Sequence, residues 1–276
     1  MTPPPLPTKR KALHPTATWV PISVGLIFLF FIGRYAFDRL SLSRKIAARM
    51  GEIRKVGHPV TLAELNQWYA QVPSEENAAH IYARAFANLS LAATNSSELP
   101  LLGRGKLPPR TQPLSDKSRK AIAVLLAENH AALELLHEGA SRRRCRYPID
   151  MRPGLKTLLP HLSKLKTSAQ LLELNALTQA EAGDLPGAAR TIEDLSALAE
   201  SLAQEPILIS QLVRIASEEM ALSTVERIMN RQRFGPDELA HLSRRLGAGR
   251  DDAALRRGWI GERCFGIDIF QMPNAK

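Results

Sequence analysis

The stretch LLPHLSKLKTSAQLLELNALTQA, residues 158–180, has the clearest periodicity of any part of the chain. Its apolar side chains recur at alternating spacings of four and three residues and close on a spacing of four, which places them on one face of an α-helix. These side chains are Leu158, Leu162, Leu165, Ala169, Leu172, Ala176 and Ala180. Gly183 and Asp184 end the pattern, and Pro186 stands just inside a second helix. A turn this short predicts that the two helices run antiparallel.

The same periodicity continues to residue 246. Pro206 and the pair Gly235-Pro236 mark the breaks between the helices that follow. The expected apolar faces are Ala188, Ile192, Leu195, Ala199 and Leu202 in one helix, Leu208, Leu212, Ile215, Leu222, Val225 and Met229 in the next, and Leu239, Leu242 and Leu246 in the last. Aromatic residues make up only 5% of the chain, and this scarcity favours helices over strands. The predicted fold class is therefore all-α, a bundle of antiparallel helical hairpins.

Earlier helices are expected at residues 62–71, 74–92 and 116–138. The sequence TLAE at 61–64 matches a capping box and predicts the start of the first of them. Residues 94–114 hold proline, glycine and polar clusters and are expected to form a loop. Residues 141–150, SRRRCRYPID, form a basic connector. Together with the later helices these elements make up one predicted domain, 57–276.

A second, separate feature is the run PTATWVPISVGLIFLFFIG at residues 15–33, which carries no charged side chain. At about 1.5 Å per residue, a helix of this length spans roughly the 30 Å hydrocarbon core of a bilayer. We therefore predict a single transmembrane anchor at 15–37, preceded by a basic tail at 1–14 and followed by a juxtamembrane segment at 38–56 that continues its helix. The residues expected in the membrane are Trp19, Val24, Leu26, Phe28, Phe30 and Ile32. A cleaved signal peptide is disfavoured because no small-residue cleavage site follows the run.

The net charge of +10 is concentrated around this segment. Residues 1–56 hold ten Lys/Arg and two acids, which gives +8 and leaves +10 − 8 = +2 for the remaining 220 residues. The basic surplus therefore indicates anionic headgroups rather than a nucleic acid as the partner. The residues expected to contact headgroups are Arg34, Arg39, Arg44 and Lys45.

The sequence leaves the orientation of the domain open. The excess of Lys/Arg after the apolar run places the C-terminal side in the cytoplasm. The short basic tail before it is instead typical of a signal-anchor, which keeps the N-terminus inside and puts the domain outside the cytoplasm. The second orientation is the one we expect.

Several groups of residues could carry chemistry. His130, Glu134 and His137 share one helix face and could bind zinc, but a fourth ligand is missing, and a solvent-facing polar stripe is the explanation that we favour. The arginines of the connector, at 142, 143, 144 and 146, could bind phosphate or lipid headgroups, or could form a solvated connector that packs on an acidic helix face. Glu75 and Glu76 are explained by helix capping, and Glu262 by a surface ion pair. Cys145 and Cys264 could pair or stay as free thiols. The sequence therefore predicts no catalytic residue, no cofactor and no metal.

Two resemblances bear on the architecture. Residues 172–195 resemble one tetratricopeptide-type unit, with Gly183-Asp184 in its turn, although Leu172, Ala176 and Gln179 stand where that unit has its usual Trp, Gly and Tyr. The whole chain resembles a group of bacterial proteins with one N-terminal span and an all-helical domain. The segments that carry this likeness are the apolar run, PSEENAAHIYARA at 73–85, LPHLSKLKTSAQLLELNAL at 159–177, EPILISQLVRIA at 205–216 and GERC at 261–264. The resemblance implies a single-pass protein of the bacterial inner (cytoplasmic) membrane and implies no activity.

The function expected from these observations is a membrane-tethered interaction or scaffold module. Paired helices tend to present an extended groove to a protein or peptide. The alternatives are a membrane-anchored hydrolase with an unrecognised site and a peripheral protein that binds anionic lipid. A groove without converging titratable groups would favour the interaction module, and a closed pocket around His130, His137 or Glu262 would favour the enzyme.

Overall fold

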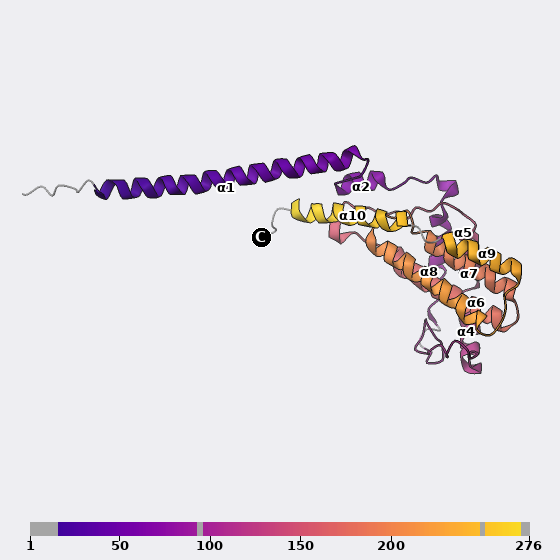
Figure 1. Cartoon of the computed structure of the whole chain (residues 1–276). Helices are drawn as coiled ribbons and strands as arrows, with labels where there is room; N and C mark the ends of the chain where they lie inside the picture. Colours follow the sequence, from indigo (N-terminus) through magenta and orange to yellow (C-terminus); the bar gives the residue numbers. More distant parts are fainter. Residues whose placement is uncertain (1–15, 93–95, 249–251, 272–276) are drawn as a thin grey trace, which may run out of the picture. The chain divides into compact units, whose positions relative to one another are not determined.

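The computed structural model describes residues 16–92, 96–248 and 252–271, with the side chains of 23–92, 96–247 and 252–271. The described residues are all-α, as predicted, and no strand occurs among them (Figure 1). The chain divides into two compact units, Met1–Gly57 and His58–Lys276, which are taken in turn below.

The first unit is one continuous helix, α1, Thr16–Lys55. Gly57 follows it with φ +80°, a backbone conformation that favours glycine, and its N–H donates to the Arg54 carbonyl (2.9 Å). The large apolar side chains between Val24 and Ile32 are exposed, each by 49–67%. Among the helices in the described part of the chain, none combines the length and the hydropathy that a membrane crossing requires. Residue 15 of the predicted anchor and the side chains of residues 16–22, Trp19 among them, lie outside what the structure describes.

The second unit opens with short elements: α2 Leu62–Trp68, the 3₁₀ turn η1 Ser74–Glu76 and α3 Ala78–Ala87. The capping box forms, because Thr61 Oγ1 accepts from the Glu64 N–H (3.2 Å). Its return bond goes one residue further back than the standard pattern, since Glu64 Oε2 accepts from the N–H of Val60 (2.9 Å). The helix predicted at 74–92 is shorter, and Asn77 caps it by accepting from the Ala79 N–H (3.1 Å).

The single helix predicted over 116–138 is wrong, because the chain breaks at Asn129 into α4 Asp116–Glu128 and α5 His130–Ala140. The Asn129 side chain is buried. Its Nδ2 donates to the carbonyls of Leu125 (2.9 Å) and Ser90 (3.0 Å), and its Oδ1 accepts from the Ser90 N–H (2.8 Å). A buried amide side chain needs hydrogen-bond partners for both its oxygen and its nitrogen. The contact of Asn129 with Ser90 supplies them, and the helix is interrupted there.

The centre of the unit is the predicted helical pair, α6 Pro160–Glu181 and α7 Leu185–Glu200 (Figure 1). Gly183 turns the chain with φ +86°, and Asp184 caps α7 by accepting from the Gly187 N–H (2.9 Å). The predicted face of α6 is buried except for Leu158, which precedes the helix and is exposed. From Ser168 onward α6 is also buried on its other sides, where Leu171, Leu174 and Leu177 pack. The 3₁₀ turn η3, Gly154–Lys156, leads into this helix.

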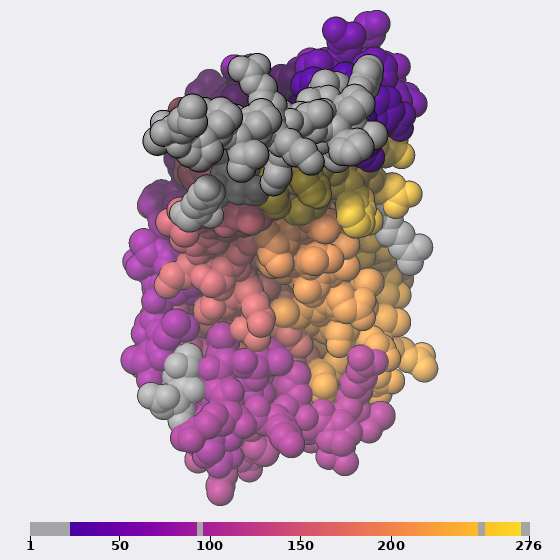
Figure 2. Space-filling model, turned by 90° about the vertical axis from the view of Figure 1, so that its left-hand side faces the viewer, coloured from indigo at the N-terminus to yellow at the C-terminus, as the bar shows by residue number. Residues whose placement is uncertain are grey.

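The predicted apolar face of α8, Leu208–Met229, is the wrong face. Its members Leu212, Ile215, Leu222 and Met229 are 41–50% exposed. The residues that α8 buries are instead small or polar: Ser210, Gln211, Arg214, Ser217, Ala221, Thr224 and Ile228. Figure 2 shows the open surface of α8 in orange, between the magenta loop and the yellow α10.

Hydrogen bonds explain why α8 can bury a polar face. Ser217 and Thr224 donate to carbonyls four residues back in their own helix (2.9 and 2.7 Å), so their hydroxyls need no partner from another element. Gln211 Nε2 donates to the carbonyls of Leu202 (2.9 Å) and Glu205 (2.7 Å), which closes the turn between α7 and α8. Small side chains at a helical spacing then let the neighbouring helices approach closely.

The last helices are α9 Pro236–Ala248 and α10 Asp252–Gln271. A Cβ on Gly261 would lie 1.7 Å from the Pro206 carbonyl oxygen, so only glycine permits α10 to pack this close to the turn before α8. Arg263 donates to the carbonyl of Pro59 (2.9 Å), and the Cys264 thiol contacts the same oxygen at 3.3 Å. These bonds join the GERC segment to the start of the unit, near α2.

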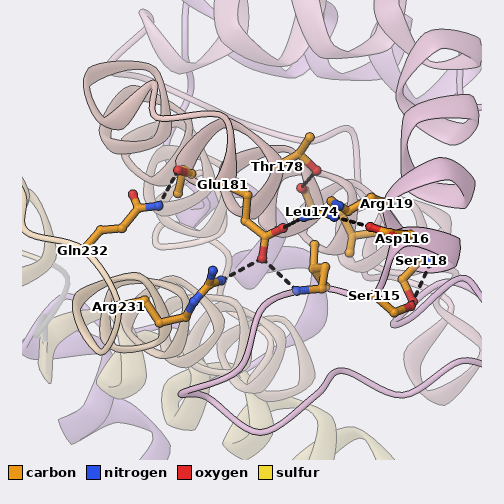
Figure 3. Close-up of polar contacts among 11 residues, drawn as sticks. Ser115, Asp116, Ser118, Arg119, Leu174, Thr178, Glu181, Arg231 and Gln232 are labelled. Atoms are coloured by element: carbon orange, nitrogen blue, oxygen red, sulfur yellow. Dashed lines mark hydrogen bonds and ion pairs between the residues drawn. The ribbon is translucent and has the colours of Figure 1, made fainter.

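Figure 3 shows how Glu181, at the C-terminal end of α6, ties three elements together. Its Oε1 accepts from the Leu114 N–H (2.8 Å) and from Arg231 (2.7 Å), and Arg119 of α4 lies 3.6 Å from Oε2. An acid at a helix C-terminus is unfavourable by itself, and the two guanidinium groups offset that cost. The same contacts hold the end of the loop predicted at 94–114. Its described residues, 96–114, contain no helix.

The polar buried face of α8 can be tested with two substitutions on that helix. Ser217→Leu places extra volume in a packed contact and should lower the free energy of unfolding by about 1–3 kcal/mol. Leu212→Gln changes an exposed side chain and should shift it by less than about 0.5 kcal/mol. Urea denaturation of the full-length protein in neutral detergent measures both, and a larger loss for Leu212→Gln would show that the predicted apolar face is the buried one.

Glu173 of α6 should make stability depend on pH. Burial raises the pKa of its carboxyl to about 7, and Arg227 works against this rise. The folded chain therefore holds a proton that the unfolded chain releases above about pH 4.5, so stability falls as the pH rises from there to about 7. Glu173→Gln should be more stable than the unmodified chain by up to about 3 kcal/mol at pH 8 and equal to it near pH 4. Parallel stability profiles from denaturation at each pH would contradict this.

Candidate functional site

The basic connector 141–150 lies against the start of α3, where Asn77 holds it. Asn77 Oδ1 accepts from the Arg146 N–H (2.8 Å), and its Nδ2 donates to the Arg146 carbonyl (3.0 Å). The N–H of Ala78 donates to the Arg144 carbonyl (2.9 Å). One side chain thus caps a helix and fixes the backbone of a segment almost 70 residues away.

The four arginines of the connector have different surroundings. Arg144 pairs with Glu76 (2.7 Å), and Arg142 donates to the Glu75 carbonyl (3.2 Å), so these two pack on the acidic segment before α3 as one of the two expectations had it. The Arg146 guanidinium lies over the Tyr69 ring, 4.5 Å from its centroid. Arg143 is exposed, and no ion pair joins it to any other part of the chain that the structure describes.

Three of these arginines line a pocket of about 630 Å³, which we call the arginine pocket. Its walls come from the connector, α7 and the turn after it, α9 and the segment before η1. Arg142, Arg143 and Arg144 stand on one side, and Arg245 of α9 and Glu200 of α7 complete the charged lining. Arg245, like Arg143, has no ion-pair partner within the described ranges. The pocket therefore carries a formal surplus of positive charge.

The floor of the arginine pocket is formed by small and aromatic side chains. Tyr82 and Cys145 are buried there beside alanines of three elements. Ser201, also in the lining, exchanges a hydrogen bond with the Tyr147 hydroxyl (3.0 Å). The Tyr147 ring stacks on His161 at 4.5 Å, and His161 Nε2 lies 2.9 Å from the fully buried carboxylate of Glu205. The floor is thus apolar in front and backed by a polar network.

The arginine pocket continues into two smaller hollows, of about 250 and 370 Å³. The first shares Ala140, Ala197 and Arg245 with the arginine pocket. The second shares His137 and Asp194 with the first and extends along α5, α6 and α7. Because neighbouring hollows share their walls, the three form one elongated depression, which we call the groove.

The zinc hypothesis places His130, Glu134 and His137 in this groove, and the structure does bring them to one hollow. They do not converge on a point, however. His130 Nδ1 faces Glu134 (3.7 Å), whereas His137 Nδ1 bonds to Asp194 of α7 (2.9 Å). No group of three His, Cys, Asp or Glu side chains in the described part of the chain could hold a metal ion.

The pair His137 and Asp194 has the geometry of a base and its orienting carboxylate. Burial raises the pKa of Asp194, and the hydrogen bond from His137 works against this rise. A nucleophilic mechanism would also need a hydroxyl or thiol bonded to the imidazole. Ser141 lies in the same hollow, but its hydroxyl donates to the Glu138 carbonyl (2.7 Å). Among the described residues, His137 and Asp194 thus supply the base and its orienting carboxylate, and no nucleophile is bonded to the imidazole.

The other predicted residues lie elsewhere. Arg34, Arg39, Arg44 and Lys45 are exposed on α1, where Arg34 pairs with Asp38 (3.2 Å). Glu75 and Glu76 contact the connector, through the Glu75 carbonyl and the Glu76 carboxylate, and do not form a carboxylate site together. Glu262 stays half-buried on α10, outside the groove. Cys145 and Cys264 are both buried free thiols, so the alternative of a disulfide is wrong.

No protein-family model, curated protein or solved structure matches this chain. The all-helical part of the two resemblances agrees with the fold, while the tetratricopeptide arrangement and the bacterial group stay predictions.

The sequence did not point to Arg245, Asp194 or Tyr82 as members of a site. Arg245 lies about a hundred residues after the connector arginines, and only the packing of α9 on α7 brings it to them. No local pattern could have found this, because an arginine in the last turn of a helix is equally explained by the helix dipole.

Both thiols should be protected in the folded protein. Burial raises the pKa of Cys145 to about 12 and that of Cys264 to about 11. At pH 8 we expect a disulfide reagent such as DTNB to modify the native chain at least about a hundredfold more slowly than the urea-unfolded chain. The variants Cys145→Ala and Cys264→Ala assign each rate, and rapid release of one equivalent from native protein would contradict the buried positions.

Proposed function

We propose that this chain is a membrane-anchored interaction module that binds a segment of another protein in the groove. The observation that carries the proposal is the arginine pocket, where Arg143 and Arg245 meet from different elements without an ion-pair partner among the described residues. Two guanidinium groups held at one hollow are suited to carboxylates, which they can bind with paired hydrogen bonds.

The shape of the groove favours a protein segment as the occupant. It runs beside paired antiparallel helices, as in helical-repeat modules, which use such surfaces for extended peptides. Its lining combines alanines at the arginine pocket and the adjoining hollow with Asn175, Gln179 and Arg190 in the third, polar side chains that can form hydrogen bonds with a peptide backbone. We propose in addition that residues 172–195 form a tetratricopeptide-like unit within this module.

The anchor is part of the same proposal. The apolar side chains of α1 between Val24 and Ile32 are exposed in one continuous belt, and the uncharged run extends back to residue 15. An exposed belt of this kind is stable when lipid covers it. Arg34, Arg39, Arg44 and Lys45 follow it at the position where cations contact anionic headgroups. We place the protein in the bacterial inner membrane, with the domain outside the cytoplasm.

The experiment has two arms in cells that express the full-length chain. In the first, alkaline carbonate should leave the chain in the membrane pellet, and Phe28→Arg with Phe31→Arg should release it to the supernatant. In the second, a photo-crosslinking amino acid replaces Gln204, an exposed residue of the arginine pocket. We expect one discrete protein adduct, which Arg143→Glu with Arg245→Glu should abolish.

The matched control carries the crosslinker at Lys120 of α4, which is exposed and lies outside the groove. An adduct that is equally strong from position 120, or that survives the double arginine change, would show that the groove is not where a partner binds. Carbonate extraction of the unmodified chain would refute the anchor alone.

A further inference from the structure

We infer that the groove selects a partner segment whose acidic residues are gathered at one end and whose basic residues are gathered at the other. The inference rests on the proposed function, because it specifies which kind of segment the groove takes. It follows from the distribution of charge along the three hollows.

The end of the groove at the arginine pocket is positive. Four arginines line it against one acid, Glu200. Arg142 and Arg144 are positioned by the Glu75 carbonyl and by Glu76, while Arg143 and Arg245 have no ion pair within the described residues. A carboxylate entering this end meets guanidinium groups from two directions above an apolar floor, so it exchanges water for charge-assisted hydrogen bonds.

The other end is negative. The two smaller hollows are lined by Glu134 of α5 and by Glu193 and Asp194 of α7, against Arg190 as the one arginine that belongs only to this end. Histidine imidazoles neighbour each of these acids: His130 Nδ1 lies 3.7 Å from Glu134, His137 Nδ1 2.9 Å from Asp194, and His241 Nδ1 4.0 Å from Glu193. Three carboxylates stand here against Arg190 and the shared Arg245, so acids outnumber guanidinium groups at this end.

An extended segment is favoured over a compact anion because the surplus of positive charge and the surplus of negative charge lie at different ends of the groove, although Arg245 lines both the arginine pocket and the hollow beside it. A free phosphate or a small acid would use the arginine pocket alone and would gain nothing from the acids of the other end. A chain that spans the groove with both charge types satisfies each end, and a chain with mixed charges places like charges together at both ends.

The test compares two peptides of identical composition and net charge on the full-length protein in neutral detergent at pH 8 and low salt. One has a block of glutamates and a block of lysines joined by a Gly/Ser spacer, and the other has glutamate and lysine alternating. Fluorescence anisotropy should show the block peptide binding about tenfold more tightly than the alternating one. The block peptide should also form an adduct with the photo-crosslinking amino acid at position 204, an exposed residue of the arginine pocket.

Charge-reversal variants then locate the effect. Arg143→Glu with Arg245→Glu, or Glu134→Lys with Glu193→Lys, should each remove the preference for the block peptide. All four changes together should restore it, because the peptide can bind with its ends exchanged. Lys117→Glu with Lys120→Glu, on the exposed surface of α4, is the control and should keep the preference. Thermal melting of each variant confirms folding, and the comparison of the two peptides on the unmodified chain needs no variant.

Equal affinity for the two peptides overturns the inference. If both also form an adduct from position 204, the groove still binds segments and the proposed function stands. If neither binds, the charge preference is refuted, and crosslinking from position 204 decides the proposed function independently.

Discussion

The burial of α6 is the constraint on which the rest of the helical unit depends. From Ser168 to Ala180 this helix has neighbours on almost every side, so α7 and α8 and the elements around them must all present surfaces that fit it. Fully buried helices are unusual in a domain of this size, because most helices keep one face in water. Since α7 buries a comparable set of residues, the pair of α6 and α7 supplies much of the apolar core, and the surrounding helices can be short or partly polar.

This constraint explains which parts of the fold can be predicted from the sequence. The ends of α6, α7 and α9 follow from Gly183, Asp184, Pro186, Pro206 and Pro236, whose effects on the backbone are local. The buried face of α8 does not, because Ser217 and Thr224 satisfy their hydroxyls within the helix and so act as small residues. Counting apolar residues selects the opposite face. A count of small residues at the same spacing would have selected the buried one.

The candidate site divides in the same way. The connector arginines are visible as a charge run. Packing on an acidic segment is observed for Arg142 and Arg144, while anion binding stays a prediction, with Arg143 lining the pocket beside them. The shared face of His130, Glu134 and His137 is also visible, because it depends only on helix geometry. What the sequence could not supply is the partner of each group across elements: Asp194 for His137, and Arg245 for the arginine pocket. These depend on how helices cross, and crossing is decided by packing.

The break at Asn129 has a consequence for how the shape of this unit is encoded. Proline or glycine would interrupt a helix through its own backbone, in any surroundings. Asn129 interrupts it through an amide that reaches Ser90, 39 residues earlier. The break between α4 and α5 therefore depends on a tertiary contact between two residues that are far apart in the sequence. The direction of α5, which forms one side of the groove, therefore depends on the contact between Asn129 and Ser90. Neither segment determines that direction by itself.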